Sequence, residues 1–93
     1  MATISERKYF AKLADFGCIL CAKLGHEGTP AEIHHLRNAG IRANAPVIPL
    51  CPEHHRGNTG IHGLGKKAFE RMYALTEQDL LKLTHSIIGI PNG

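Results

Sequence analysis

With 93 residues the chain has room for one domain, and a domain of this length buries only about 60 to 65% of its unfolded surface. Its three cysteines are an odd number, which excludes a purely disulfide-paired framework, and nowhere do roughly 18 apolar residues run together to span a bilayer. The net charge of +3 permits a polyanionic partner without identifying one. We expect a single domain over residues 1–93 that needs a staple and, because MATISERKYF lacks the apolar core of a signal peptide, a cytoplasmic location.

The first expected element is a helix over about residues 4–16. Apolar residues recur there at helical spacing, Ser5 is a candidate N-cap and Gly17 a candidate stop. The stretch from Cys21 to Ala31, CAKLGHEGTPA, is rich in turn-forming residues and is expected to be a loop.

A β-hairpin is expected next, because the strand candidates EIHHL and PVIPL flank the turn-forming segment RNAGIRANA. The following segment, CPEHHRGNTGIHGLG, contains four glycines and is expected to be an irregular loop, after which KKAFERMYAL recovers a helical pattern. A capping box at Thr76 and Asp79 opens a last helix over about residues 77–88. Its apolar face comprises Leu80, Leu83, Ile87 and Ile88.

Two chelating pairs carry the strongest chemical signal. Cys18-x-x-Cys21 and Cys51-x-x-His54 have the spacing that tetrahedral Zn²⁺ prefers, and they lie about thirty residues apart. A structural zinc would also supply folding energy that the thin core lacks. The other interpretations are a redox-active Cys-x-x-Cys pair and three buried free thiols.

Four further histidines, His34, His35, His55 and His62, have no obvious core role. Neighbours on a strand face opposite sides of the sheet, so His34 and His35 are expected to do different jobs. Metal-assisted phosphodiester hydrolysis needs such a division, with one group holding the metal and another taking a proton from water. The competing interpretations are a solvated loop cluster and one enlarged zinc network. His26 is expected to be an exposed loop residue, and His85 is expected to make packing or surface contacts within the last helix.

The segments AEIHHLRNAG, VIPLCPEHHRG and GIHGLGKKAFERMY together resemble the HNH (ββα-metal) endonucleases. They are most similar to the bacteriophage recombination-enhancement (Ref) nuclease branch, over about residues 18–75. The expected order of helices and strands predicts a small, zinc-stapled α+β domain, and the resemblance implies that it has the ββα-metal (HNH) fold with flanking helices. It also implies that His35 is the general base and that the catalytic metal is held by His34, His55 and His62.

Two departures from the commoner HNH pattern are visible. The last two metal ligands often sit about one helical turn apart, whereas a glycine-containing insertion separates His55 from His62. The Asn that usually supports the base is not in its place, and Asn44 is the candidate for that role. An exchange of His54 and His55 between the two metal sites stays open.

The resemblance implies a metal-dependent endonuclease that hydrolyses DNA and acts on single-stranded or recombinase-coated DNA. Imidazole ligands favour Zn²⁺, Ni²⁺ or Co²⁺ at the catalytic site, and the oxygens of a substrate phosphate would also admit Mg²⁺ or Mn²⁺. The lack of an aromatic-interleaved basic patch predicts low sequence specificity. Basic residues around the histidines are candidates for phosphate contacts, although a solvated face is the other interpretation for some of them; they are Arg37, Arg42, Arg56, Lys66, Lys67 and Arg71. The alternatives are a non-catalytic zinc-binding module for nucleic acid or protein, and an RNA-directed nuclease.

Overall fold

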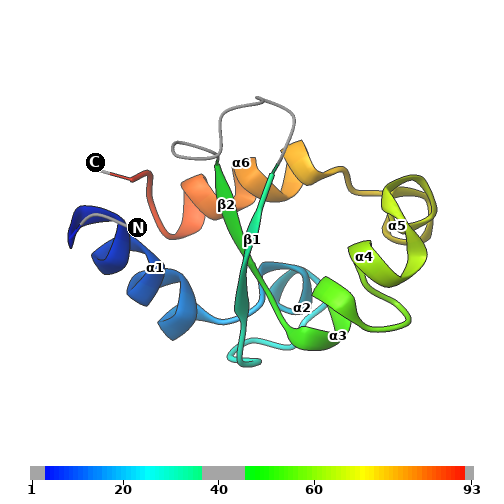
Figure 1. The fold of residues 1–93 in the computed structure, drawn as a ribbon, viewed down its shortest axis with the longest axis horizontal. Helices are drawn as coiled ribbons and strands as arrows, with labels where there is room; N and C mark the ends of the chain where they lie inside the picture. Colours follow the sequence, from blue (N-terminus) through cyan, green and yellow to red (C-terminus); the bar gives the residue numbers. More distant parts are fainter. Residues whose placement is uncertain (1–3, 37–45, 92–93) are drawn as a thin grey trace.

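The computed structural model describes residues 4–36 and 46–91. Its elements are α1 (Ile4–Phe16), α2 (Ile19–Lys23), β1 (Glu32–His35), β2 (Val47–Leu50), α3 (Pro52–Arg56), α4 (Ile61–Leu64), α5 (Lys66–Tyr73) and α6 (Glu77–Ile87). In Figure 1 the two strands run through the middle of the molecule, with α1 on one side and α4 and α5 on the other. The predicted α+β class is confirmed for this part of the chain.

The two strands form the expected antiparallel hairpin, in which Glu32 lies opposite Leu50 and His35 opposite Val47. Because side chains alternate along a strand, His34 is buried, whereas His35 is exposed. This alternation separates the two histidines as predicted. The expected turn, RNAGIRANA, coincides with residues 37–45, outside the described residues.

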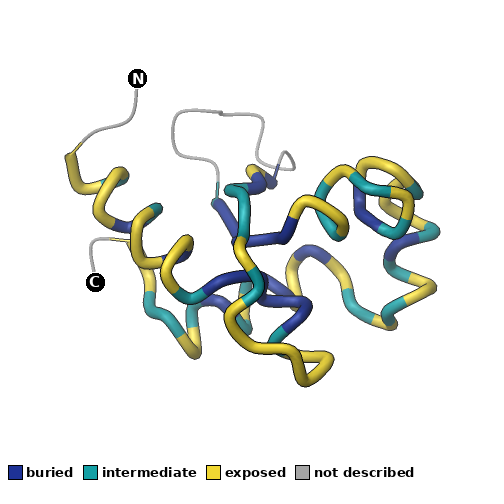
Figure 2. The backbone as a smooth tube through the Cα atoms, turned by 90° about the horizontal axis from the view of Figure 1, so that it is seen from below, coloured by how far each residue is buried: buried dark blue, intermediate teal, exposed yellow. Residues whose placement is uncertain are grey.

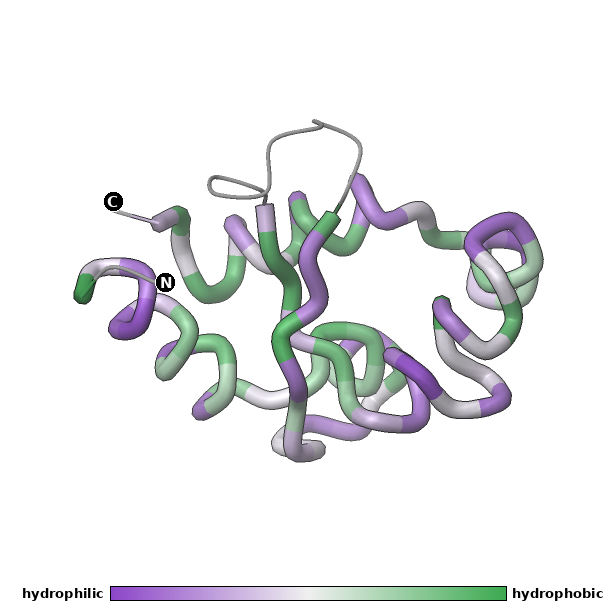
Figure 3. Tube along the Cα trace, viewed as in Figure 1, coloured by the Kyte–Doolittle hydropathy of each residue, from purple (hydrophilic) through white to green (hydrophobic). Residues whose placement is uncertain are grey.

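The core lies between the hairpin and the helices. Figure 2 shows the buried backbone gathered in the centre, and Figure 3 shows β2 as mainly hydrophobic and β1 as mixed. All four residues of β2 are buried, so this strand is covered on both faces. The largest fully buried side chains around it come from α1, α2, α5 and α6 and include Leu13, Ile19, Leu20, Phe69 and Leu80.

Two segments that were expected to be irregular contain the short helices α2, α3 and α4. Cysteine sulfur atoms cap the first turns of α2 and α3. The Cys18 Sγ accepts a hydrogen bond from the Cys21 N–H at the start of α2, and the Cys51 Sγ accepts one from the His54 N–H at the start of α3, both at 3.4 Å. Each sulfur thus takes the place of the side-chain oxygen of an ordinary N-cap. The loop prediction was wrong at Cys21–Lys23, Pro52–Arg56 and Ile61–Leu64, which are helical, and it is confirmed for residues 24–31 and 57–60. Cys is not a usual N-cap residue, which explains why the starts of α2 and α3 were missed.

The outer helices differ from the sequence prediction only in detail. Helix α1 begins at Ile4, so Ser5 lies inside the helix instead of capping it. The capping box of α6 is confirmed. Ile87 was expected on the apolar face of this helix, but it is 54% exposed. Neighbouring residues on a helix point about 100° apart, and Ile88 is the one that packs against the hydrophobic cluster around Tyr9. Among the described residues, no helix is long and apolar enough to cross a membrane.

Candidate active site

Four ligand-type side chains meet where α2 and α3 begin. The Sγ atoms of Cys21 and Cys51 lie 3.7 Å apart. The Nδ1 atom of His54 lies 3.7, 3.4 and 3.3 Å from the Sγ atoms of Cys18, Cys21 and Cys51. A tetrahedral zinc with bonds of about 2.3 Å to sulfur and about 2.0 Å to nitrogen has ligand-to-ligand edges of about 3.5 to 3.8 Å. We name this group the Cys₃His cluster, and its spacing fits one zinc ion.

Burial shifts the pKa values of the Cys₃His cluster. Burial raises the pKa of the Cys18 thiol to about 12 and also raises the pKa of Cys51, because a thiolate loses its hydration there. Burial lowers the pKa of His54, which keeps its ring neutral and able to donate a lone pair. A divalent metal would compensate the thiolate charge, since coordination deprotonates a thiol outright.

A second group, the His triad, consists of His34 from β1, His55 from α3 and His62 from α4. The ring centroids are 5.1 Å apart for His34 and His55, 5.2 Å for His34 and His62, and 4.8 Å for His55 and His62. The candidate ligand nitrogens all lie within 4.8 Å of one another. Because His34 is buried whereas His62 is exposed, a metal held here would be open to solvent on the His62 side.

His54 and His55 are neighbours in α3, yet they belong to different groups. The structure places His54 with the cysteines and His55 with the triad. Among the described residues, neither His26 nor His85 belongs to a group of possible metal ligands. His26 is exposed and His85 is half-buried on α6.

Close packing of α4 on α3 brings His62 to His55 across the glycine-containing insertion. A Cβ atom on Gly63 would collide with the carbonyl oxygen of Gly57, and one on Gly60 would collide with the backbone of α3. Only glycine permits such a backbone approach. The insertion that departs from the commoner HNH spacing is therefore the feature that allows the two histidines to meet.

Two carboxylates that sequence analysis did not single out bond to the triad. The Glu77 Oε2 lies 2.6 Å from the His34 Nε2, and the Glu32 Oε1 lies 2.9 Å from the His55 Nδ1. The hydrogen bond with His34 holds the pKa of Glu77 below its usual value, and hydrogen bonds with Arg56 and then His55 lower the pKa of Glu32. Glu77 could not be found from spacing, because it lies 43 residues from His34.

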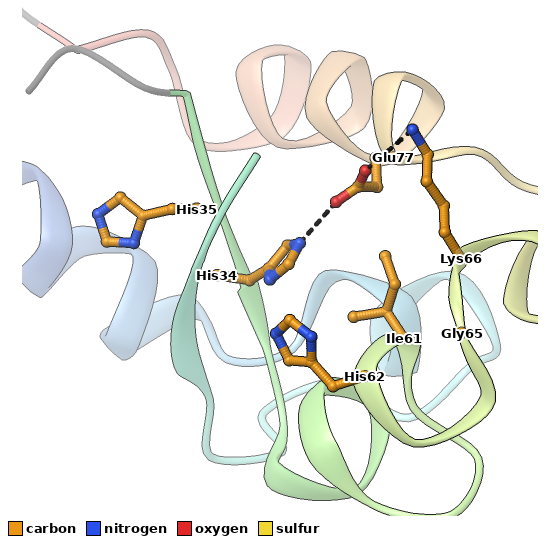
Figure 4. Close-up of a pocket in the computed structure, with 7 residues that line it drawn as sticks. All are labelled: His34, His35, Ile61, His62, Gly65, Lys66 and Glu77. Atoms are coloured by element: carbon orange, nitrogen blue, oxygen red, sulfur yellow. Dashed lines mark hydrogen bonds and ion pairs between the residues drawn. The ribbon is translucent and has the colours of Figure 1, made fainter. Parts of the chain in front are cut away.

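A pocket of about 490 Å³ opens beside the triad (Figure 4). It is lined by His34, His35, Ile61, His62, Gly65, Lys66 and Glu77. His35 contributes to the lining, but its ring lies on the other side of β1 from the triad, on the side of α1. There it meets the Phe10 ring edge-on, with centroids 6.2 Å apart. The predicted base is thus beside the triad and not within it.

The predicted phosphate-contacting residues occupy different environments. Arg56 forms two hydrogen bonds with Glu32, at 2.7 and 3.1 Å. Lys66 places its Nζ 3.5 Å from the Glu77 Oε1, at the pocket wall. Lys67 and Arg71 line a separate hollow on α5. Arg37, with Arg42 and Asn44, lies outside the described residues.

Comparison with protein families places the chain among nucleases. The matching family model is described as "Recombination enhancement, RecA-dependent nuclease" and covers residues 2–88. Because the match spans nearly the whole chain, the protein belongs to this family of RecA-dependent recombination-enhancement nucleases. Searches of curated proteins and of solved structures found no match.

Proposed function

We propose that the chain is a metal-dependent DNA endonuclease of the ββα-metal (HNH) type, formed as one domain over residues 1–93, with its active site at the His triad. One observation carries the proposal: histidines from β1, α3 and α4 converge beside a pocket in a chain that belongs to a nuclease family. A hairpin followed by short ligand-bearing helices agrees with that fold type.

The triad is the proposed catalytic metal site, for Mg²⁺, Mn²⁺, Zn²⁺ or Ni²⁺. His34, His55 and His62 would each donate one imidazole nitrogen. Such an ion, when bound, polarises the scissile phosphate and stabilises the departing 3′ oxygen. Neutral imidazoles leave the charge of the ion undiminished, which suits a polyanionic substrate.

His35 is the proposed general base. In its neutral form the ring accepts a proton from water that attacks the phosphorus in line, and it later releases that proton to solvent, leaving a 5′ phosphate on the product. Its place in the pocket lining and its exposed position support this role, because water can reach the ring. Imidazole is suited to this task at neutral pH.

The Cys₃His cluster is proposed to hold a structural zinc. Three buried thiols and one neutral imidazole complete a tetrahedral set, so no position remains for substrate. The metal would contribute its binding energy to folding.

The proposed substrate is single-stranded or RecA-coated DNA, cut with low sequence specificity, because the family description names RecA. Lys66 at the pocket wall and Lys67 and Arg71 on α5 are proposed phosphate contacts, with Arg56 and Arg37 as further candidates. Such contacts position a backbone without reading its sequence.

The test is cleavage of DNA with and without RecA and added Mg²⁺ or Mn²⁺, comparing the wild type with His35→Ala. We expect a loss of roughly 10²-fold or more, as for removal of a general base, with zinc content unchanged. His26→Ala, which removes an exposed histidine outside both groups, is the matched control and should cut normally. An unchanged rate in His35→Ala would remove this residue from the mechanism. If the wild type cuts neither this DNA nor, in a parallel assay, RNA, a binding module is favoured instead.

A further inference from the structure

The two carboxylates beside the His triad bond to the nitrogens that a metal would not use. The Glu77 Oε2 contacts the Nε2 of His34 at 2.6 Å, and in Figure 4 the other ring nitrogen of His34 lies on the side of His62. The Glu32 Oε1 contacts the Nδ1 of His55 at 2.9 Å, which leaves the Nε2 of that ring for coordination. Each carboxylate can therefore accept a hydrogen bond from the N–H that a neutral imidazole carries on the nitrogen away from the metal.

Both carboxylates are themselves held in place by cations. Lys66 approaches the Glu77 Oε1 at 3.5 Å, and Arg56 binds both oxygens of Glu32. Glu77 is only 7% exposed and begins α6 immediately after its N-cap, so its backbone position is fixed by the capping box. A buried carboxylate in this position needs a partner, and His34 and Lys66 supply it.

We infer that Glu77 and Glu32 are positioning residues of the metal site, which fix the tautomers of His34 and His55 so that the metal meets the Nδ1 of the first and the Nε2 of the second. This inference rests on the proposed function of the triad. A carboxylate behind a ligating imidazole orients the ring and increases its basicity, and its loss typically costs 10-fold to 100-fold in metal affinity.

The two positioning residues are unequal. The side chain of Glu77 is 9% exposed and that of Glu32 is 31% exposed, so water competes more effectively for Glu32. Arg56, at 67% side-chain exposure, is a solvent-facing partner of Glu32. Glu77 should therefore contribute the larger share of the effect on metal binding.

The affinity test titrates Ni²⁺ into zinc-containing wild type, Glu77→Gln and Glu32→Gln by calorimetry. Glutamine keeps the size of the side chain and removes its charge. We expect affinity to fall about 10-fold to 100-fold in Glu77→Gln and less than about 10-fold in Glu32→Gln. Glu27→Gln, the same change at an exposed residue outside both groups, is the matched control and should bind as the wild type does.

A second measurement needs no variant and does not depend on activity. Nitrogen-15 chemical shifts of the histidines, recorded with zinc in the cysteine cluster and before Ni²⁺ is added, distinguish the two neutral tautomers. We expect the proton of His34 on Nε2 and that of His55 on Nδ1, with a mixture for His34 in Glu77→Gln. The opposite tautomers in the wild type would overturn the inference even if a variant did not fold.

The outcomes separate this inference from the proposed function. If the wild type binds Ni²⁺ and His62→Ala does not, the triad is a metal site; unchanged affinity in Glu77→Gln then overturns the inference alone. If the wild type and His62→Ala bind Ni²⁺ equally, the proposed metal site fails and the inference fails with it.

Discussion

The two ligand groups differ in burial and chemistry although α3 contributes neighbouring residues to both. The Cys₃His cluster has three buried thiols, and its burial raises the pKa of Cys18 to about 12. The His triad consists of three imidazole side chains, and one of them, that of His62, is exposed. The first group brings three sulfur atoms and one imidazole together, whereas the second brings three imidazoles together beside a pocket.

This difference fits the structural role proposed for the Cys₃His cluster and the catalytic role proposed for the His triad. Thiolates neutralise the charge of a metal and fill its coordination positions, so the ion has little left to offer a phosphate. Neutral imidazoles do not reduce the charge of a bound metal ion, and three of them leave at least one coordination position open. The full charge of the ion would therefore be available to a phosphate. Ligand removal should accordingly have different consequences in the two groups.

The largest expected effect is that of Cys21→Ala. Loss of a structural zinc forfeits a binding free energy on the order of 10 kcal/mol, which is comparable with the whole stability of a small domain. We expect an unfolded, zinc-free chain by circular dichroism and metal analysis. His62→Ala, the matched change in the triad, should stay folded and keep its zinc. A folded, zinc-containing Cys21→Ala protein would erase the distinction between the groups.

An intermediate effect is expected for Gly63→Ala. The added methyl group collides with the Gly57 carbonyl oxygen, so α4 must move away from α3 and carry His62 with it. A misplacement of about 1 Å can cost on the order of 10²-fold in rate. We expect cleavage and Ni²⁺ binding to fall while zinc content stays at one per chain. Normal cleavage in this variant would mean that the reaction does not depend on the position of His62.

The smallest expected effect is that of Thr76→Ala, which removes the N-cap hydrogen bond of α6 at 3.0 Å. Loss of such a cap typically costs ~1 kcal/mol of unfolding free energy, measurable by denaturant titration. Because Glu77 follows the cap directly, Ni²⁺ affinity should weaken more than zinc retention does. If Ni²⁺ affinity and zinc retention weakened equally, α6 would also stabilise the Cys₃His cluster.

The sequence predicted those features that depend on local spacing. Alternation along one strand separates His34 from His35, and chelating pairs three residues apart bring Cys51 and His54 together whatever the rest of the fold does. The α+β class followed from the same local patterns. The association of His55 with His62 was expected only through the family resemblance, because nothing local indicates that α4 folds back on α3.

The features that the sequence could not predict depend on contacts between distant segments or on unusual caps. Glu77 reaches His34 from 43 residues away, and its position after Thr76 made it look like an ordinary first-turn residue. Helix α3 is capped by a sulfur atom, so the usual N-cap residue was absent from the sequence and Pro52 at the first helical position was the remaining signal of a helix start. Glu32 was hidden for a different reason, since it begins the same strand as His34 and its contact with His55 depends on where α3 lies.

The adjacency of His54 and His55 also limits how this chain can vary in length. Successive residues of a helix point about 100° apart, so one residue inserted or deleted between Cys51 and Gly57 would turn at least one ligand away from its group. Substitutions in α3 outside His54 and His55 should therefore be tolerated better than insertions or deletions. In a comparison of relatives, the length of this short helix should therefore stay constant, because it places His54 in one ligand group and His55 in the other.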